Sequence, residues 1–324
     1  MRQDYSKQIL QAILNQYPKI GAIEDFKLFT SGFENSNYYV KTSQGEYVIK
    51  IYEGMGMNNN NIKFEIEVMD ACHQAGCKTP HILKNKNGEL YIYYEKKIAI
   101  VMHFIPGKNV DKKHINNETA YTIGQQTGKM DQALSKFPDN GLTRQNYEFD
   151  GKTFLQLEKK VKYLPDYIDK KIINSIFKSF REIEKHFKKL PTGLIHNDIC
   201  LHNIIVRNNK LACIIDFSDM AFSPYIQNIS VPMSQLIFTY NWQPQQATLL
   251  IKGYIEHRPL SGSELDVLYI YTLSRYAISI IEFNYWNIKF GADNQRTKHI
   301  CDTYDFIKKF LTLGKRQFNN LINL

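Results

Sequence analysis

The sequence predicts an α+β fold in which a sheet-rich first lobe is followed by a mostly helical second lobe. Short apolar runs typical of strands dominate up to Phe104, whereas helical spacing of apolar residues dominates after the break at Pro106-Gly107. At 324 residues the chain is also longer than one average domain. We therefore expect a first lobe over residues 1–104 and a second lobe over residues 105–324.

The first lobe should begin with a helix, because Ile9, Leu10, Ile13 and Leu14 recur at helical spacing before Pro18. A three-strand meander follows, since three apolar runs are separated by polar turns. The expected elements, in order, are a helix over 6–17, strands over 26–30, 38–42 and 47–52, a helix over 62–75, and strands over 80–83, 90–94 and 98–104.

One segment of the second lobe departs from the helical pattern. Three apolar runs there predict short strands, at residues 193–195, 204–206 and 211–215. A polar turn over residues 207–210 should join the last two strands as a hairpin. This arrangement would carry Asp198, Asn203 and Asp216 to one rim of the lobe.

Asp198, Asn203 and Asp216 are the residue types that phosphoryl transfer from ATP requires, in the required order. Asp198 would orient an attacking hydroxyl and accept its proton, while Asn203 and Asp216 would bind Mg²⁺ through oxygen. Each residue alone could instead stabilise a turn, because Asp and Asn side chains bond nearby backbone. The agreement of spacing, flanking strands and order favours an active site with ATP and Mg²⁺ as cofactors.

Lys50 lies in an otherwise apolar strand, where an ammonium group is costly unless it is paired. Its expected partner is a carboxylate on the following helix. Glu65 is favoured over Glu67 because its neighbours one and two turns later, Met69 and Cys72, form an apolar face. We expect Lys50 to hold the ATP phosphates while Glu65 fixes its direction; an edge lysine with its head in water is the alternative.

Two further segments should contact the nucleotide. The turn over residues 31–37 would lie over the triphosphate, with Gly32, Asn35 and Asn37 as candidate contacts, although the two asparagines could equally cap the turn. The segment ending at Phe104 would join the lobes, and its backbone would read the adenine edge. Met102 or Phe104 would flank the adenine ring, or would simply pack in the core.

Composition is that of an ordinary globular protein, with 43% hydrophobic and 23% charged residues. The net charge of +9 comes from lysine pairs scattered over predicted helices, without a stripe of interleaved aromatic residues. We therefore expect no nucleic-acid partner. The sequence also predicts no membrane span and no signal peptide. The five cysteines have no metal-binding spacing and are expected as core residues of a cytoplasmic protein.

Over most of residues 5–220 the chain resembles the aminoglycoside phosphotransferase-like superfamily of small-molecule kinases, which share the protein-kinase fold. The segments 32–38 and 47–53 are most similar to type II homoserine kinases, and 194–217 is similar to the superfamily as a whole. The resemblance implies that Asp198 is the catalytic base, that Asn203 and Asp216 bind Mg²⁺, and that Lys50 contacts ATP. It also implies that His196 supports the loop backbone through hydrogen bonds.

Three departures from the family pattern concern the acceptor rather than the reaction. Type II homoserine kinases often lack a lysine at the position of Lys50. The superfamily often has an aspartate before the helix that follows the metal-binding aspartate, whereas this chain has residues 224–228 without one. The segments 274–279 and 290–294 are similar to hydroxylysine-kinase-like relatives.

The acceptor is expected to be a small amino compound, whose ammonium prefers carboxylate or aromatic neighbours. Homoserine is the first choice, and hydroxylysine, choline, ethanolamine and aminoglycosides are alternatives. A nucleotide-binding pseudokinase and a protein kinase are the competing functions, and a monomer or a homodimer is expected. The candidate acceptor-binding residues, for which surface or core placement is the alternative, are Asp219, Glu282 and Trp286, with Arg275 or Lys289 for an acceptor carboxylate.

Overall fold

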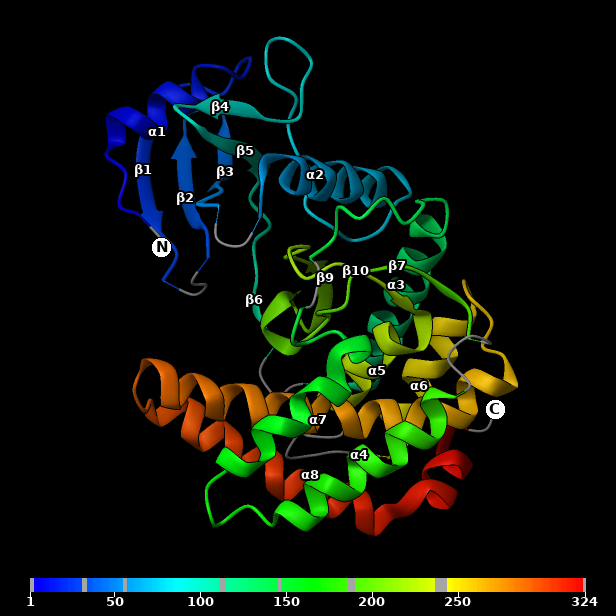
Figure 1. The fold of residues 1–324 in the computed structure, drawn as a ribbon. Helices are drawn as coiled ribbons and strands as arrows, with labels where there is room; N and C mark the ends of the chain where they lie inside the picture. Colours follow the sequence, from blue (N-terminus) through cyan, green and yellow to red (C-terminus); the bar gives the residue numbers. More distant parts are fainter. Residues whose placement is uncertain are drawn as a thin grey trace.

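The computed structural model describes residues 3–30, 34–54, 57–110, 115–144, 147–185, 190–236 and 244–322. An antiparallel sheet with the strand order β1-β2-β3-β5-β4 forms the N-terminal part, and helices dominate the C-terminal part (Figure 1). The predicted α+β fold is confirmed. The boundary between the two lobes at Phe104 stays a prediction. Phe104 is the residue after His103, where the last strand of this sheet ends.

The N-terminal elements are α1 (Lys7–Leu14), β1 (Ile23–Leu28), β2 (Ser36–Thr42), β3 (Gly45–Ile51), α2 (Asn59–Gln74), β4 (Ile92–Tyr94) and β5 (Lys97–His103). Side chains of β3 alternate between the two faces of the sheet. Ile49 and Ile51 belong to the apolar cluster that contains α1, whereas Tyr52 belongs to the larger cluster that contains α2. This alternation turns Lys50 toward α2.

Several predicted bounds of this part need correction. The first helix ends at Leu14 rather than at residue 17, and the first strand spans Ile23–Leu28 rather than 26–30. The second helix begins at Asn59 rather than at residue 62, because the Asn58 side chain accepts from the backbone of Asn60 and Asn61 and forms a capping box. The strand predicted over residues 80–83 is reduced to an isolated bridge between Ile82 and Met102. Pro80 has no N–H group to donate to a ladder, which limits a longer strand.

The C-terminal part contains short strands that were predicted and others that were not. β8 (Ile204–Arg207) and β9 (Lys210–Ile214) pair as the expected hairpin, and β6 (Lys108–Asn109) extends it. The predicted strand at 193–195 is β7 (Thr192–Ile195), whose partner is β10 (Ala221–Pro224). The helices are α3 (Asn117–Leu134), η1 (Gly151–Tyr163), α4 (Lys170–Glu184), η3 (Leu201–Asn203), α5 (Tyr225–Leu236), α6 (Pro244–Ile255), α7 (Gly262–Phe290) and α8 (Asn294–Ile322).

The pair α3 and α6 packs closely behind the loop that carries Asp198. A Cβ atom at Gly128 would lie 2.3 Å from the carbonyl oxygen of Tyr254, so only glycine permits this approach of the two backbones. The approach brings Tyr254 of α6 against Asp131 of α3. Within the described ranges, no helix is both long and apolar enough to cross a bilayer.

Candidate active site

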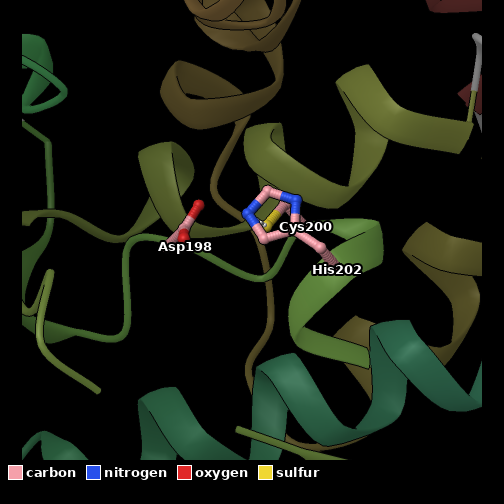
Figure 2. Close-up of side chains that lie close together, drawn as sticks. All are labelled: Asp198, Cys200 and His202. Atoms are coloured by element: carbon pink, nitrogen blue, oxygen red, sulfur yellow. Dashed lines mark hydrogen bonds between the residues drawn. The ribbon is translucent and has the colours of Figure 1, made fainter. Parts of the chain in front are cut away.

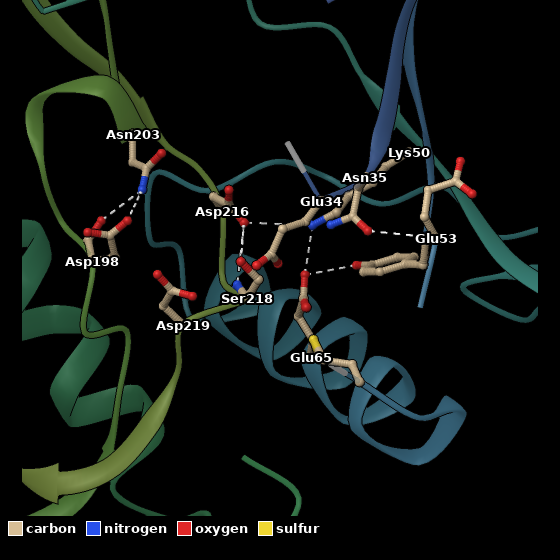
Figure 3. A network of polar contacts seen from close by, with 12 residues as sticks. Glu34, Asn35, Lys50, Glu53, Glu65, Asp198, Asn203, Asp216, Ser218 and Asp219 are labelled. Atoms are coloured by element: carbon tan, nitrogen blue, oxygen red, sulfur yellow. Dashed lines mark hydrogen bonds and ion pairs between the residues drawn. The ribbon is translucent and has the colours of Figure 1, made fainter. Parts of the chain in front are cut away.

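The buried ion pair between Lys50 and Glu65 forms one side of the candidate site (Figure 3). Lys50 Nζ lies 2.9 Å from Glu65 Oε1, and the Tyr52 hydroxyl donates to the same oxygen atom at 2.9 Å. Lys50 is 7% exposed and Glu65 is fully buried, whereas Glu67 is exposed. Burial alone would lower the pKa of Lys50, but the charge of Glu65 raises it well above its ordinary value. The lysine is therefore a permanent cation.

Asp216 brings the second part of the site to this lysine. Its Oδ1 atom lies 3.8 Å from Lys50 Nζ and accepts a hydrogen bond from the Ser218 hydroxyl at 2.8 Å. Desolvation acts to raise the pKa of Asp216, but Lys50 and Ser218 hold it below its usual value. Its backbone has a φ of 66°, an uncommon conformation for a residue with a side chain. An ionised carboxylate, 48% exposed, thus faces the lysine.

Asp198 and Asn203 lie together on the loop between β7 and β8 (Figure 3). The Asn203 amide nitrogen donates to the Asp198 carboxylate at 2.7 Å and to its backbone carbonyl at 3.0 Å. Because the nitrogen faces Asp198, the amide oxygen of Asn203 points to the other side. This oxygen and the Asp216 carboxylate are the donor types that Mg²⁺ prefers, so the residues present fit the expected metal.

His196 lies behind the same loop, inside the core. It is fully buried, and its Nδ1 accepts from the backbone N–H of Asp198 at 3.3 Å. Burial lowers the pKa of His196, which keeps the imidazole neutral and able to accept. Its ring packs against Phe217, beside Asp216.

A buried amide network holds the loop from behind, and sequence reasoning missed it. Asn197 has a φ of 66°, its backbone N–H donates to Asn228 Oδ1 at 2.9 Å, and its side chain accepts from Gln227 at 2.7 Å. Asn228 in turn donates to Asp131 at 2.6 Å, and Tyr254 donates to the other oxygen of Asp131. Gln227 and Asn228, in the segment where the resemblance leads us to expect an aspartate, thus anchor the Asp198 loop through amides.

A second missed cluster surrounds Asp219, the predicted acceptor-binding carboxylate. The Tyr147 hydroxyl donates to Asp219 Oδ2 at 2.6 Å, and Arg144 Nη1 lies 3.6 Å from Asp219 Oδ1. Arg144 also forms a two-point ion pair with Glu34. Burial and the nearby charge of Asp198 raise the pKa of Asp219 to about 8. No periodicity in the sequence marks Arg144 or Tyr147, because both lie in an irregular segment before η1.

The other predicted acceptor-binding residues are engaged within the protein. Arg275 donates to the carbonyl oxygen of Phe149 at 2.5 Å, and the Trp286 ring lies edge-on to the Phe149 ring at 6.0 Å. Glu282 is 1% exposed and pairs with Lys160 at 2.7 Å. Arg275 and Trp286 both contact Phe149, whose ring packs against Tyr147 of the Asp219 cluster. The charge of Glu282, in contrast, is already neutralised by Lys160.

The predicted nucleotide contacts are placed as follows. Gly32 lies outside the described residues. Asn35 accepts from the backbone N–H of Glu53 at 3.3 Å, which is a turn-stabilising role, and Asn37 lies opposite Lys50 in the β2–β3 ladder. Met102 is 7% exposed within the core, and the Phe104 ring packs edge-on against Tyr39.

The backbone near the predicted adenine contact is partly occupied. The N–H group of Phe104 donates to the Glu46 carbonyl at 3.0 Å, and that of His103 donates to the His81 carbonyl at 3.1 Å. These two N–H groups are therefore already paired and are not available to an adenine edge.

Cys200 and His202 lie beside the predicted base (Figure 2). The Cys200 sulfur lies 3.0 Å from His202 Nε2, and one donor atom from each of Asp198, Cys200 and His202 falls within 4.8 Å of the others. Sequence spacing did not indicate this cluster. Cys200 is 4% exposed, as expected for a core cysteine, and burial raises the pKa of its thiol well above the ordinary value. The thiol is therefore protonated and is not a nucleophile. The expectation of a core position is wrong for Cys301, which is exposed.

Comparison with known proteins agrees with this geometry. Residues 25–262 match the Phosphotransferase enzyme family (APH). Homoserine kinase of Brucella abortus (strain S19) is 24% identical over 273 residues, which cover 82% of this chain and 80% of that protein. Homoserine kinase of Mesorhizobium japonicum is 24% identical over 269 residues, covering 82% and 81%.

Solved structures share the fold at low sequence identity. Amicoumacin kinase hAmiN in complex with AMP-PNP, Ca²⁺ and Ami has a TM-score of 0.70 at 16% identity, covering 96% of this chain and 97% of that one. The microcompartment-associated aminopropanol kinase has a TM-score of 0.66 at 14% identity, covering 98% and 100%. With the family match spanning both the sheet and the loops that carry Asp198 and Asp216, the chain belongs to the Phosphotransferase enzyme family.

Proposed function

We propose that this phosphotransferase moves the γ-phosphoryl group of ATP to the hydroxyl of a small amino compound, with homoserine as the preferred acceptor. The observation that carries the proposal is the 3.8 Å contact between Lys50 and Asp216. These residues come from the sheet and from the loop after β9, far apart in sequence. They meet beside the pair of Asp198 and Asn203, so the groups that phosphoryl transfer needs lie together (Figure 3).

Asp198 is the proposed base. It orients the acceptor hydroxyl and takes its proton as the phosphoryl group is transferred. The hydrogen bond from Asn203 restricts the rotation of the Asp198 carboxylate, so that the hydroxyl meets a carboxylate of fixed direction. Positioning of this kind is the main contribution that a protein makes to phosphoryl transfer.

Lys50 is the proposed phosphate ligand. Glu65 and Tyr52 hold it in place, and its raised pKa keeps the charge that the phosphate oxygens require. Asn203 and Asp216 would hold Mg²⁺, which neutralises phosphate charge when it is bound. Asp219 and Tyr147 would face the ammonium group of the acceptor.

Homoserine is preferred because the two curated relatives described above, which match about four fifths of this chain, are homoserine kinases. The test is ADP release from Mg·ATP across a panel of L-homoserine, hydroxylysine, ethanolamine, 3-aminopropan-1-ol and an aminoglycoside. ³¹P NMR of the product identifies the phosphate ester. We expect acceptor-dependent turnover that is fastest with L-homoserine. Acceptor-independent ATP hydrolysis alone, or no turnover at all, would contradict the proposal.

A further inference from the structure

Arg144 is enclosed between two carboxylates at the edge of the site. It pairs with Glu34 through both terminal nitrogens, and its Nη1 lies 3.6 Å from Asp219 Oδ1. Its guanidinium also lies over the Tyr147 ring, 5.3 Å from the centroid. Its Nε atom is buried and has no hydrogen-bond partner within the described part of the chain. Arg144 thus has an unused donor beside the carboxylate expected to bind the acceptor.

The two partners in the Arg144–Glu34 pair differ in exposure. The Arg144 side chain is 13% exposed, whereas the Glu34 side chain is 40% exposed. Glu34 can turn into water at little cost, but Arg144 cannot, because a buried guanidinium without a counter-charge is strongly unfavourable. Departure of Glu34 therefore favours another anion at its position, because Asp219 lies 3.6 Å from Nη1 and Glu34 is the carboxylate on Nη2.

We propose that this anion is the carboxylate of the acceptor, and that Arg144 makes the enzyme selective for hydroxy amino acids over amino alcohols. The inference rests on the proposed function and identifies the substrate class of the same site. Glu34 occupies the guanidinium when no acceptor is bound. An amino acid brings its ammonium to Asp219 and its carboxylate to Arg144, and the planar fork of arginine matches a carboxylate through two hydrogen bonds.

The chemistry of the pair fits this ligand. The ammonium and carboxylate of an amino acid are attached to one carbon atom, and Asp219 and Arg144, an acid and a cation, are direct neighbours at 3.6 Å. Tyr147 contacts both residues and fixes their relative position. The side chain of Asn197, the residue before Asp198, donates to the backbone carbonyl of Asp219 at 3.1 Å, which places the pair close to the proposed base.

The two cations that the sequence suggested for a carboxylate are less suitable. Arg275 is committed to the carbonyl oxygen of Phe149. Lys289 is exposed at the end of α7, with its ammonium over the Phe290 ring. Arg144, in contrast, lies against Asp219, the carboxylate proposed to bind the ammonium group of the acceptor.

The test compares two acceptors that differ only in the carboxylate, L-homoserine and 3-aminopropan-1-ol. The quantity measured is the ratio of their kcat/KM values. We expect Arg144→Gln to lower this ratio about 10- to 100-fold, since hydrogen bonds to charged groups contribute that much. The loss should appear mainly in KM for L-homoserine. Arg144→Lys, which keeps the charge but not the fork, should give an intermediate ratio.

Two further variants separate this role from a structural one. Glu34→Gln breaks the same ion pair from the other side, and we expect it to leave the ratio at or above the wild-type value. Arg181→Gln is the matched control, because Arg181 forms an exposed pair with Glu158 elsewhere. Equal losses for both acceptors in Arg144→Gln and Glu34→Gln would overturn the inference and show that the pair only connects two segments.

A binding measurement distinguishes failure of this inference from failure of the proposed function. The thermal shift produced by L-homoserine is recorded with AMP-PNP and Mg²⁺ present, which requires no turnover. We expect a shift in the wild-type protein that is absent in Arg144→Gln. If the wild-type protein phosphorylates only amino alcohols, the phosphotransferase function stands and the inference is overturned. If no acceptor is phosphorylated, the proposed function is contradicted. The inference about Arg144 is then decided by the binding measurement alone, and the absence of a thermal shift with L-homoserine in the wild-type protein would overturn it.

Discussion

The Lys50 side and the Asp198 side of the site are held in different ways. Lys50 lies within a sheet strand, is almost fully buried, and finds its partner Glu65 only 15 residues later in the chain. Asp198 and Asp216 lie on loops, and Asn197 and Asp216 both have positive φ angles. The Asp198 side takes its support from Asn228 and Asp131, on two different helices.

The difference reflects what each side must do. A buried cation has to be neutralised at once, so Lys50 carries its own counter-ion and is rigid because it is paired. In the proposed function the carboxylates on the loops bind ligands, and they carry no buried ion pair like that of Lys50; Asp216 is 48% exposed and faces Lys50 at 3.8 Å. Their rigidity comes from buried hydrogen bonds to the backbone behind them.

The largest effect is expected from Asp198→Asn. It removes the proposed base but keeps the size of the side chain, so phosphorylation should fall by about 10²- to 10⁴-fold. The unfolding midpoint and the affinity for AMP-PNP should stay close to wild type. Steady-state ADP release and a thermal melt check both points. An equally active variant would show that Asp198 is not the base.

Lys50→Met tests the Lys50 side of the site. It leaves Glu65 without its cation, and we expect a loss of about 3–5 kcal/mol in the free energy of unfolding, together with a loss of activity. The double variant Lys50→Met/Glu65→Leu should recover most of the stability but none of the activity. Urea titration and ADP release measure the two effects. Recovery of activity in the double variant would contradict the role assigned to Lys50.

Asn228→Ala tests the support behind the loop. It leaves the backbone N–H of Asn197 buried and unpaired, so unfolding should become easier by about 1–3 kcal/mol and kcat should fall. Asn284→Ala is the control, since Asn284 is 9% exposed and donates to the Tyr163 carbonyl away from the loop. If both variants lower kcat equally, the network has no specific connection to the loop.

The smallest effect concerns pH. Burial raises the pKa of Asp131 from 3.8 in the unfolded chain to about 7 in the folded protein. A raised pKa means that the folded state holds the proton more tightly, so this contribution to stability is lost as pH rises through about 7. Between pH 6 and 8 the wild-type protein should lose roughly 1 kcal/mol relative to Asp131→Asn.

Chemical denaturation at several pH values measures this difference. The control is Asp166→Asn, because Asp166 is exposed. A pH dependence in Asp131→Asn identical to that of the wild-type protein would show that Asp131 does not titrate in this range.

Local patterns in the sequence were sufficient to predict the three-strand meander, the β8–β9 hairpin and the pairing of Lys50 with Glu65. Period-two alternation decides which face of β3 carries Lys50, and helical spacing decides that Glu65 rather than Glu67 is buried. The start of α2 and the absence of a full strand over residues 80–83 depended on a capping residue and a proline, whose effects are not periodic.

The sequence by itself determined the α+β order and the residue types available for phosphoryl transfer, because both are encoded in short-range periodicity and spacing. Only the tertiary structure decided that Asn228 anchors the Asp198 loop and that Arg144 stands between Glu34 and Asp219. These contacts join irregular segments and separate helices. Their partners are selected by buried space and by the need to satisfy every buried polar group, neither of which leaves a repeating pattern in the chain.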